Sequence, residues 1–153
     1  MAHIIGLIAQ KGGVGKSTLS RLIAREFAGQ GWAVKIADMD VSQGTCAEWC
    51  RLRQQYGIEP DIRVETFGRV AQAIADSERF DLLVIDGAPH ATAATLEIAR
   101  ASDLVVIPTG LALDDLRPGV ILAHELVEKG VQADKLVFVL TRVGDSPAAI
   151  EDA

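Results

Sequence analysis

The chain has 153 residues, of which 49% are hydrophobic, and it carries a formal net charge of −6 at neutral pH. This length and composition indicate one folded domain rather than a disordered chain, and the acidic balance argues against whole-surface attraction to nucleic acid. The longest apolar runs, residues 82–85 and 104–108, are far too short to cross a bilayer, and no signal-peptide pattern follows Met1, so we expect a soluble, cytoplasmic protein.

Short apolar runs rich in valine and isoleucine recur along the chain, with helical stretches between them. They span residues 3–9, 33–38, 62–66, 81–86, 103–108 and 135–140. Strands that are apolar on both faces and alternate with helices predict a parallel sheet covered on both sides. We therefore expect an α/β fold with a doubly wound, mostly parallel sheet, in a single domain over residues 1–153.

The segments between these runs show helical patterns and helix-boundary residues. Helices are expected after the first strand, where glycines at 29 and 31 end the pattern, and then over 45–56, 69–76, 91–100 and 119–129. The last of these follows Pro118 and precedes Gly130, as helix boundaries commonly do. Ser146-Pro147 would begin one more helix over residues 148–153, and because it stops after about two turns we expect the natural chain to continue into a further strand and helices.

The first expected strand runs into a glycine-rich turn and then into a helix, with the sequence KGGVGKST over residues 11–18. Gly12, Gly13 and Gly15, which surround Val14, lack the side chains that would keep the backbone from wrapping around a phosphate. Their N–H groups and the positive end of the following helix predict a phosphate-binding loop.

Three side chains after the glycines suit a magnesium nucleotide. Lys16 is expected to bridge the β- and γ-phosphate oxygens, and the Ser17 hydroxyl is expected to bind Mg²⁺. Thr18 is placed to reach the α-phosphate. Together with the loop they predict binding of a nucleoside triphosphate.

Acidic residues lie where two of the expected strands end. Asp38 and Asp40 follow the second strand, and strand alternation directs both side chains the same way. Asp86 closes the apolar strand before it, an arrangement that delivers a carboxylate to Mg²⁺, usually through water. Ligands of parallel α/β sheets bind at this carboxyl edge. One carboxylate near Mg²⁺ and one near an attacking water are what hydrolysis of a γ-phosphate requires.

The loop departs from the usual G-x-x-x-x-G-K-[ST] pattern, because Gln10 stands at the first position and a second lysine, Lys11, lies inside the loop. This K-G-G-x-G-K-[ST] form resembles the deviant Walker-A ATPases, the family of the ParA partition proteins and MinD. Residues 40–45, DVSQGT, are similar to the D-P-Q-G-x segment of ParA proteins, with Val41-Ser42 in place of the proline. Residues 47–51 look like the small ParA type. A terminal amphipathic basic helix, of the kind that attaches MinD to membranes, is not seen in residues 1–153.

The resemblance implies ATP and Mg²⁺ as ligands. By the same resemblance, Lys11 would act across a nucleotide-sandwich dimer, Asp40 would orient the attacking water, Asp38 would support the Mg²⁺ shell, and the Gly87 backbone would sense the γ-phosphate. Family members often contact adenine with an Asn after the last strand seen here. Thr141 and Arg142 occupy that place, and residues 141–144 do not complete the N/T-K-x-D pattern of a GTPase, so ATP remains favoured.

The resemblance also implies an ATP-dependent homodimer that binds DNA without sequence preference and segregates it, with hydrolysis stimulated by a ParB-like partner. Asp114 and Asp115 are candidates for the dimer or partner surface. Several arginines could add to a basic DNA-contacting patch: Arg51, Arg53, Arg63, Arg69 and Arg142.

Two other functions remain open on the same loop. One is a nucleotide-switched scaffold for cargo positioning or conjugation with little or no turnover. The other is a metabolic enzyme of the amide-forming or reductase type. A reductase would carry paired cysteines at a dimer-facing loop, whereas Cys46 and Cys50 lie one turn apart on an expected helix.

Overall fold

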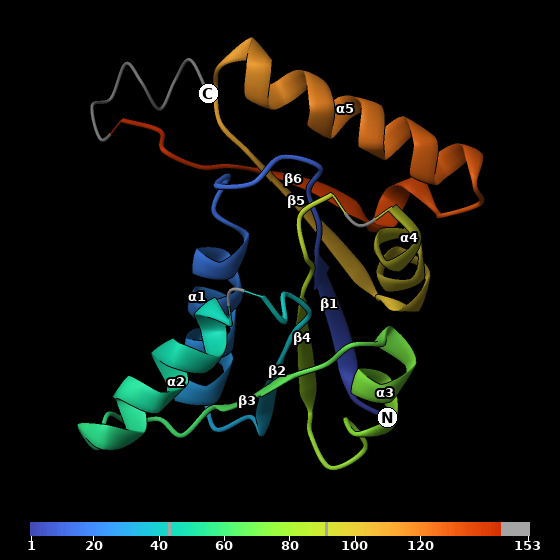
Figure 1. Cartoon of the computed structure of the whole chain (residues 1–153). Coiled ribbons are helices and arrows are strands. Elements are labelled where there is room, and N and C mark those ends of the chain that lie inside the picture. The colour runs from blue at the N-terminus through green and yellow to red at the C-terminus, as the bar shows by residue number, and fades with distance from the viewer. Residues whose placement is uncertain (43, 91, 145–153) are drawn as a thin grey trace.

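The structure is a computed structural model that describes residues 1–42, 44–90 and 92–144 (Figure 1). The strands are β1 (His3–Leu7), β2 (Val34–Asp38), β3 (Arg63–Thr66), β4 (Leu82–Asp86), β5 (Leu104–Thr109) and β6 (Leu136–Leu140). The helices are α1 (Lys16–Gly29), α2 (Thr45–Gln55), α3 (Val70–Ala75), α4 (Thr92–Ala101) and α5 (Leu113–Glu128), with a 3-10 turn at Ala133–Lys135. The helix expected over residues 148–153 and the Gln43 of the ParA-like segment lie outside the described residues.

The strands form a six-stranded sheet in the order β3-β2-β4-β1-β5-β6, and every neighbouring pair is parallel. The predicted fold class is therefore confirmed. In the register of the central strands, Asp86 stands level with both Leu7 and Asp38. The strand ends that precede the glycine loop and the acidic segments consequently meet at one edge of the sheet, as ligand sites of parallel sheets require.

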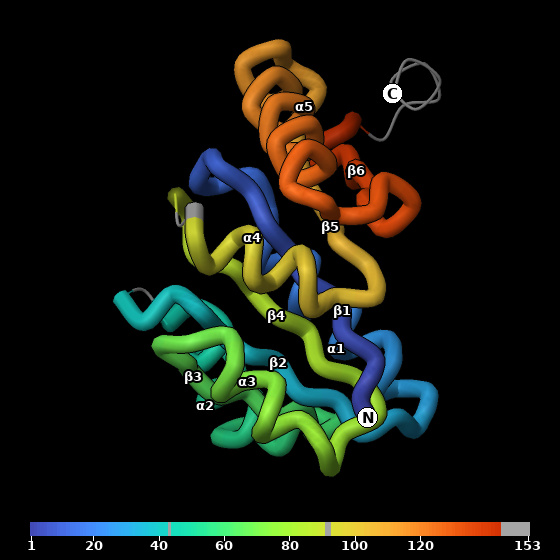
Figure 2. Tube along the Cα trace, turned by 90° about the vertical axis from the view of Figure 1, so that its right-hand side faces the viewer, coloured from blue at the N-terminus to red at the C-terminus, as the bar shows by residue number. Residues whose placement is uncertain are grey.

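Helices cover both faces of the sheet, with α1 and α2 on one face and α3, α4 and α5 on the other (Figures 1 and 2). Because neighbouring side chains of a strand point to opposite faces, β4 contributes to two separate cores. Leu82 and Val84 pack with Ala24 and Ala28 of α1, and the intervening residues of β4 pack with α3, α4 and α5. This two-sided burial explains why the central strands are apolar throughout.

Helix α5 begins at Leu113, so the expected start at residue 119 is wrong, and Pro118 lies inside the helix. The proline lacks the N–H that would continue the helical ladder at that point. The turn before it forms nevertheless, because the N–H groups of Asp115 and Leu116 both donate to the carbonyl of Ala112. Acidic residues in this first turn also suit the positive end of the helix. No helix among the described residues combines the length and hydrophobicity needed to cross a bilayer.

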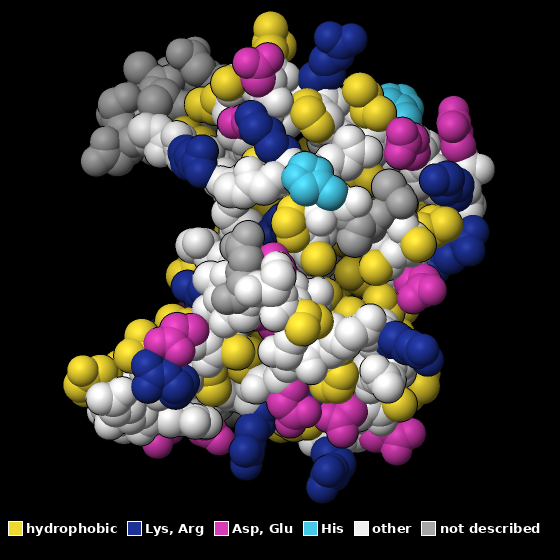
Figure 3. All heavy atoms as spheres, in the orientation of Figure 1, with side chains coloured by type: hydrophobic (Ala, Val, Ile, Leu, Met, Phe, Trp, Pro, Cys, Tyr) yellow, Lys and Arg dark blue, Asp and Glu magenta, His cyan; other side chains and the backbone are white. Residues whose placement is uncertain are grey.

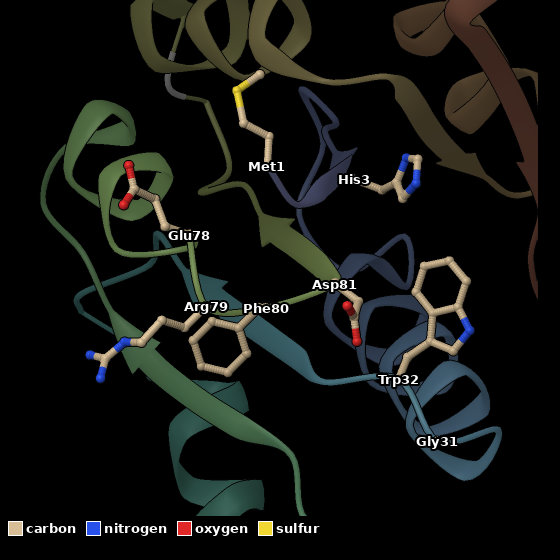
Figure 4. Close-up of a pocket in the computed structure, with 8 residues that line it drawn as sticks. All are labelled: Met1, His3, Gly31, Trp32, Glu78, Arg79, Phe80 and Asp81. Carbon is tan, nitrogen blue, oxygen red and sulfur yellow. The ribbon is translucent and has the colours of Figure 1, made fainter.

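Side-chain contacts close the amino-terminal edge of the sheet. A carboxylate oxygen of Asp81 accepts the N–H of Ala33 at 2.8 Å, and one of Asp103 accepts the N–H of Ile4 at 2.8 Å. An open hollow of about 570 Å³ lies at this edge (Figure 4). Among its lining residues, the rings of His3 and Trp32 have centroids 5.9 Å apart and are tilted by 44° relative to each other.

A buried lysine lies near the same edge. Lys35 is 1% exposed and forms ion pairs with Asp76 and, at 3.0 Å, with Glu65. Its ammonium also lies 5.0 Å and 5.4 Å from the ring centroids of Phe67 and Phe80. The charge is thus balanced by partners from β3 and the end of α3.

Candidate functional site

A cavity of about 570 Å³ opens at the carboxyl edge of the sheet. It lies between the start of α1, the ends of β2 and β4, and the end of β6, and the outline of the molecule is indented on this side in Figure 3. Most of the residues predicted from the sequence line it: Gly12, Gly13, Gly15, Lys16, Ser17, Thr18, Asp40, Asp86, Gly87, Thr141 and Arg142. The structure therefore brings segments from four parts of the chain to one cavity.

The glycine loop adopts a backbone that favours glycine. Gly13 and Gly15 have φ values of +74° and +98°, in the left-handed region that side-chain-bearing residues rarely adopt. Helix α1 follows directly, and in the described structure it has neither a side-chain hydrogen bond at its N-cap nor an acidic residue in its first turn. Free N–H groups at a helix start, next to a glycine turn, form a site for an anion such as phosphate.

Lys16 is buried at the base of this loop, with 8% of its surface exposed. Burial lowers the pKa of its ammonium, and the nearby carboxylates of Asp86 and Asp40 oppose that shift. An anion in the cavity would stabilise the charged form in the same way. The residue is therefore already desolvated where a phosphate would lie.

One carboxylate oxygen of Asp86 has a hydrogen-bond donor, and the other has none in the described structure. The residue is 3% exposed, and its Oδ2 accepts the thiol of Cys46 at 3.2 Å. Among the described residues, no donor reaches its buried Oδ1. A buried carboxylate oxygen without a donor is unfavourable unless an ion or water satisfies it. Together with the Ser17 hydroxyl, this hard oxygen suits Mg²⁺, which binds proteins through few carboxylates and keeps several waters and phosphate oxygens.

The two aspartates after β2 have different surroundings. Asp38 is 1% exposed; its Oδ1 accepts the N–H of Asp40 and its Oδ2 accepts that of Cys46, each at 3.0 Å. Burial raises the pKa of Asp38, and these backbone hydrogen bonds oppose the shift. The carboxylate thus ties the loop after β2 to the first turn of α2. It is not among the described residues that line the cavity, and its support of the Mg²⁺ shell stays a prediction.

Asp40 borders the cavity directly. Its Oδ1 accepts the N–H of Ser42 at 3.2 Å and the Ser42 hydroxyl at 2.6 Å. The carboxylate is thereby oriented by its own loop. That Asp40 orients the attacking water stays a prediction.

Gly87 continues the strand ladder in this structure. Its N–H donates to the carbonyl of Leu7 at 2.9 Å, and a Cβ added at this position would lie 2.7 Å from that oxygen. The Gly87 N–H is therefore occupied here, and sensing of a γ-phosphate by the Gly87 backbone stays a prediction. A few residues further on, His90 has a φ of +62°, which is strained for a non-glycine residue.

The two residues that follow β6 form side-chain hydrogen bonds to backbone carbonyls of the glycine loop. The Thr141 hydroxyl lies 2.9 Å from the carbonyl of Val14 and 3.2 Å from that of Thr109, and it donates to one of them at a time. Arg142 has a φ of +59° and its guanidinium donates to the carbonyl of Gly13. The sequence made these two residues candidates for nucleotide binding, and that role stays a prediction; both border the cavity.

Lys11, which directly precedes the cavity-lining Gly12, forms an ion pair with Asp115 at the start of α5. Its side chain is 48% exposed, against 16% for Asp115. It is not among the described residues that line the cavity. The sequence singled out both residues, but only the structure shows that they pair.

Sequence reasoning missed Cys46, a buried thiol in contact with Asp86, and Arg21, which donates to the carbonyl of Thr45 at 2.8 Å. A single cysteine or arginine on an amphipathic helix has no distinguishing pattern. Some of the five arginines considered for a DNA-contacting patch make local contacts, and the patch stays a prediction. Arg51 pairs with Glu48, and Arg53 donates to the carbonyls of Ile58 and Pro60.

A parallel sheet whose first strand leads through a left-handed glycine turn into a helix, with a buried carboxylate at the end of a neighbouring strand, defines a P-loop nucleotide-binding domain. Over residues 5–153 the chain matches the CobQ/CobB/MinD/ParA nucleotide binding domain, and it belongs to this family. The predicted relationship to ParA and MinD is confirmed. No curated protein sequence matches the chain.

Solved structures share the fold at low sequence identity. pNOB8 ParA bound to nonspecific DNA is 21% identical, with a TM-score of 0.75 over 99% of this chain and 72% of its own. MinD from Pyrococcus horikoshii, complexed with Mg-ADP, is 16% identical, with a TM-score of 0.73 over 99% of this chain and 77% of its own. Cobyrinic acid a,c-diamide synthase from Mycobacterium smegmatis, with bound ADP and magnesium, is 20% identical, with a TM-score of 0.68 over 99% of this chain and 80% of its own.

Proposed function

We propose that the protein is a Mg²⁺-dependent ATPase of the ParA type. ATP closes a homodimer that binds DNA without sequence preference, and a ParB-like partner stimulates hydrolysis and releases the DNA. The observation that carries this proposal is the position of Lys11, an exposed second lysine of the phosphate loop that pairs with Asp115 and is not among the described residues that line the cavity.

Each part of the cavity has a role in this proposal. The backbone N–H groups of residues 12–17 hold the phosphates, and Lys16 neutralises their charge. Ser17 and the Asp86 oxygen that has no donor in the described structure would hold Mg²⁺, which would supply positive charge to neutralise the phosphates. Asp40, oriented by Ser42, positions the attacking water.

Lys11 completes the site of a second subunit. In the single chain its ammonium pairs with Asp115, and a partly exposed pair of this kind contributes only about 0–1 kcal/mol. Little free energy is therefore lost when Lys11 leaves Asp115 for a phosphate. A phosphate group of the neighbouring subunit offers the lysine more negative charge than one carboxylate does.

DNA binding would depend on the assembled dimer rather than on net charge. The chain has a net charge of −6, and Arg51 and Arg53 are engaged in local contacts. A dimer also doubles the net negative charge, so attraction to the phosphate backbone requires that the dimer gather basic side chains of both subunits on one face. The solved ParA structure with nonspecific DNA supports this part of the proposal by analogy of fold.

The decisive experiment measures ATP binding and light scattering on the wild type, Lys11→Ala and Lys129→Ala. Lys129 is an exposed lysine beyond the end of α5, away from the cavity, and serves as the matched control. We expect the wild type and Lys129→Ala to dimerise with ATP and Mg²⁺. Lys11→Ala should bind ATP within about two-fold of the wild type but remain a monomer, because only the contact to the second subunit is lost.

Three outcomes would count against the proposal at different levels. Normal dimerisation of Lys11→Ala would show that Lys11 does not act across the interface. Tight ATP binding without turnover, even with DNA and a partner, would favour a nucleotide-switched scaffold. Absence of any affinity for ATP in the presence of Mg²⁺ would remove the basis of the proposal.

A further inference from the structure

Cys46 lies where three elements of the site meet. It is fully buried in the first turn of α2. Its N–H donates to Asp38 of β2, and its sulfur lies 3.2 Å from Oδ2 of Asp86 and 4.0 Å from the carbonyl oxygen of Ser17. The functional roles described so far do not use this thiol.

The thiol acts as a hydrogen-bond donor. An ordinary cysteine thiol, with a pKa of about 8.5, is protonated at neutral pH, and the sulfur lies within hydrogen-bonding distance of Asp86. A thiol has one proton to donate, and the Asp86 oxygen is nearer than the Ser17 carbonyl. The acceptor is an anionic oxygen, which strengthens the bond.

This hydrogen bond makes the two oxygens of Asp86 different, because only one of them has a donor in the described structure. Oδ2 is held by Cys46, whereas Oδ1 is buried and has no donor among the residues that the structure describes. Asp86 itself is one of the residues that line the cavity. With one oxygen fixed, rotation of the carboxylate about its own axis is restricted. The remaining oxygen then presents a defined direction to a cation.

We propose that Cys46 is a positioning residue for the cation site: its thiol holds one oxygen of Asp86 so that the other faces Mg²⁺ in the nucleotide cavity. This inference rests on the proposed nucleotide-binding function. The start of α2, which carries Cys46, is itself held in place, because Arg21 of α1 donates to the adjacent Thr45 carbonyl at 2.8 Å.

The chain provides a matched control for a purely structural role. Cys50 lies one turn later on α2, is 7% exposed, and donates to the carbonyl of Ile62 at 3.4 Å. It is buried in the same helix, but its thiol bonds a backbone carbonyl just before β3 rather than a carboxylate, and neither thiol lines the cavity in the described structure. Replacing Cys50 therefore tests the loss of a buried thiol without touching Asp86.

The first experiment observes the hydrogen bond itself and needs no nucleotide. Infrared spectra of Cys50→Ala and Cys46→Ala proteins each report the S–H stretch of the single remaining thiol. We expect the band of Cys46 to lie at lower frequency than that of Cys50, because a carboxylate is a stronger acceptor than a carbonyl. It should move to higher frequency when Asp86→Asn is added to Cys50→Ala. A Cys46 band that ignores Asp86→Asn would overturn the inference.

The second experiment compares the affinity for a fluorescent ATP analogue in Mg²⁺ and in EDTA. Cys46→Val keeps the size of the side chain and removes the donor, so the gain in affinity produced by Mg²⁺ should fall by about five- to ten-fold. The affinity in EDTA should stay within about two-fold of the wild type, Cys46→Ser should restore most of the gain, and Cys50→Ala should keep all of it.

The possible failures are distinguishable. If Cys46→Val retains the full Mg²⁺ gain, or if it loses affinity equally in Mg²⁺ and EDTA without rescue by serine, the positioning role is wrong while the proposed function stands. If the wild type gains no affinity from Mg²⁺, both the proposed function and the positioning role fail. In that case the S–H band still decides whether the thiol binds Asp86.

Discussion

The two edges of the sheet use the same kinds of side chain for opposite purposes. At the amino-terminal edge, carboxylates accept backbone N–H groups and the buried Lys35 lies among Asp76, Glu65 and two aromatic rings. At the carboxyl edge, the buried Lys16 faces a cavity, and one oxygen of Asp86 has no donor in the described part of the chain. Charge is balanced within the protein at the first edge and left for a ligand at the second.

The contrast shows that burial of a charge does not by itself indicate function. Lys35 is more buried than Lys16, at 1% against 8% exposure, yet its neighbours complete its contacts. The hollows at the two edges are also equal in size, at about 570 Å³ each. The glycine loop and the open carboxylate, rather than depth or volume, distinguish the functional edge.

The largest expected effect is on stability at the amino-terminal edge. Lys35→Ala should lower the free energy of unfolding by about 3 kcal/mol, because the aliphatic stem loses its packing. Lys35→Met keeps that packing and should change the free energy by less than about 1 kcal/mol, since Asp76 and Glu65 can return to solvent. Urea unfolding followed by tryptophan fluorescence measures both. Equal losses for the two variants would show that the charge, not the stem, is responsible.

A smaller effect is expected at the carboxyl edge, and on binding instead of stability. Lys16→Met should weaken ATP binding by about 2 kcal/mol, or about 30-fold, because a charged contact to phosphate is lost. Its free energy of unfolding should be unchanged or higher, since burial of the ammonium, which lowers the pKa of Lys16, no longer opposes folding. Calorimetric titration and urea unfolding test the pair of statements. A stability loss as large as that of Lys35→Ala would erase the contrast between the edges.

The smallest effect concerns pH. Hydrogen bonding to Lys35, and then its charge, lowers the pKa of Asp76 below the ordinary value of 3.8. The contribution of the pair to stability is therefore complete above pH 3.8 and is lost as the pH falls through the lower folded-state pKa. As the pH falls, the wild type should accordingly lose more unfolding free energy than Lys35→Met does. A difference that is constant from neutral pH down to about pH 2.5 would contradict the ion pair.

Much of the functional edge could be predicted from the sequence, because its signals are local. The apolar runs that end in Asp38 and Asp86, and the glycine loop before Lys16, each lie within a few residues of chain. Local pattern also fixes the parallel sheet, since apolar strands alternate with helices.

The features that the sequence did not reveal depend on contacts between distant segments. Cys46 and Asp86 are 40 residues apart and meet only because β2 and β4 are in register. The pairing of Lys11 with Asp115 spans 104 residues. Pro118 misled the prediction of α5 for a different reason, because a rule about helix starts was applied where burial of Leu122 and Leu126 outweighs one missing hydrogen bond.

The hydroxyl of Thr141 has a consequence for how the molecule can be regulated. It joins β6, which within the described chain pairs only with β5, to the carbonyl of Val14 in the phosphate loop. Any protein or chain segment that pairs with β6 and displaces its end would change the affinity of the phosphate loop for a nucleotide. By thermodynamic reciprocity, nucleotide binding would change the affinity of that strand for its partner by the same factor.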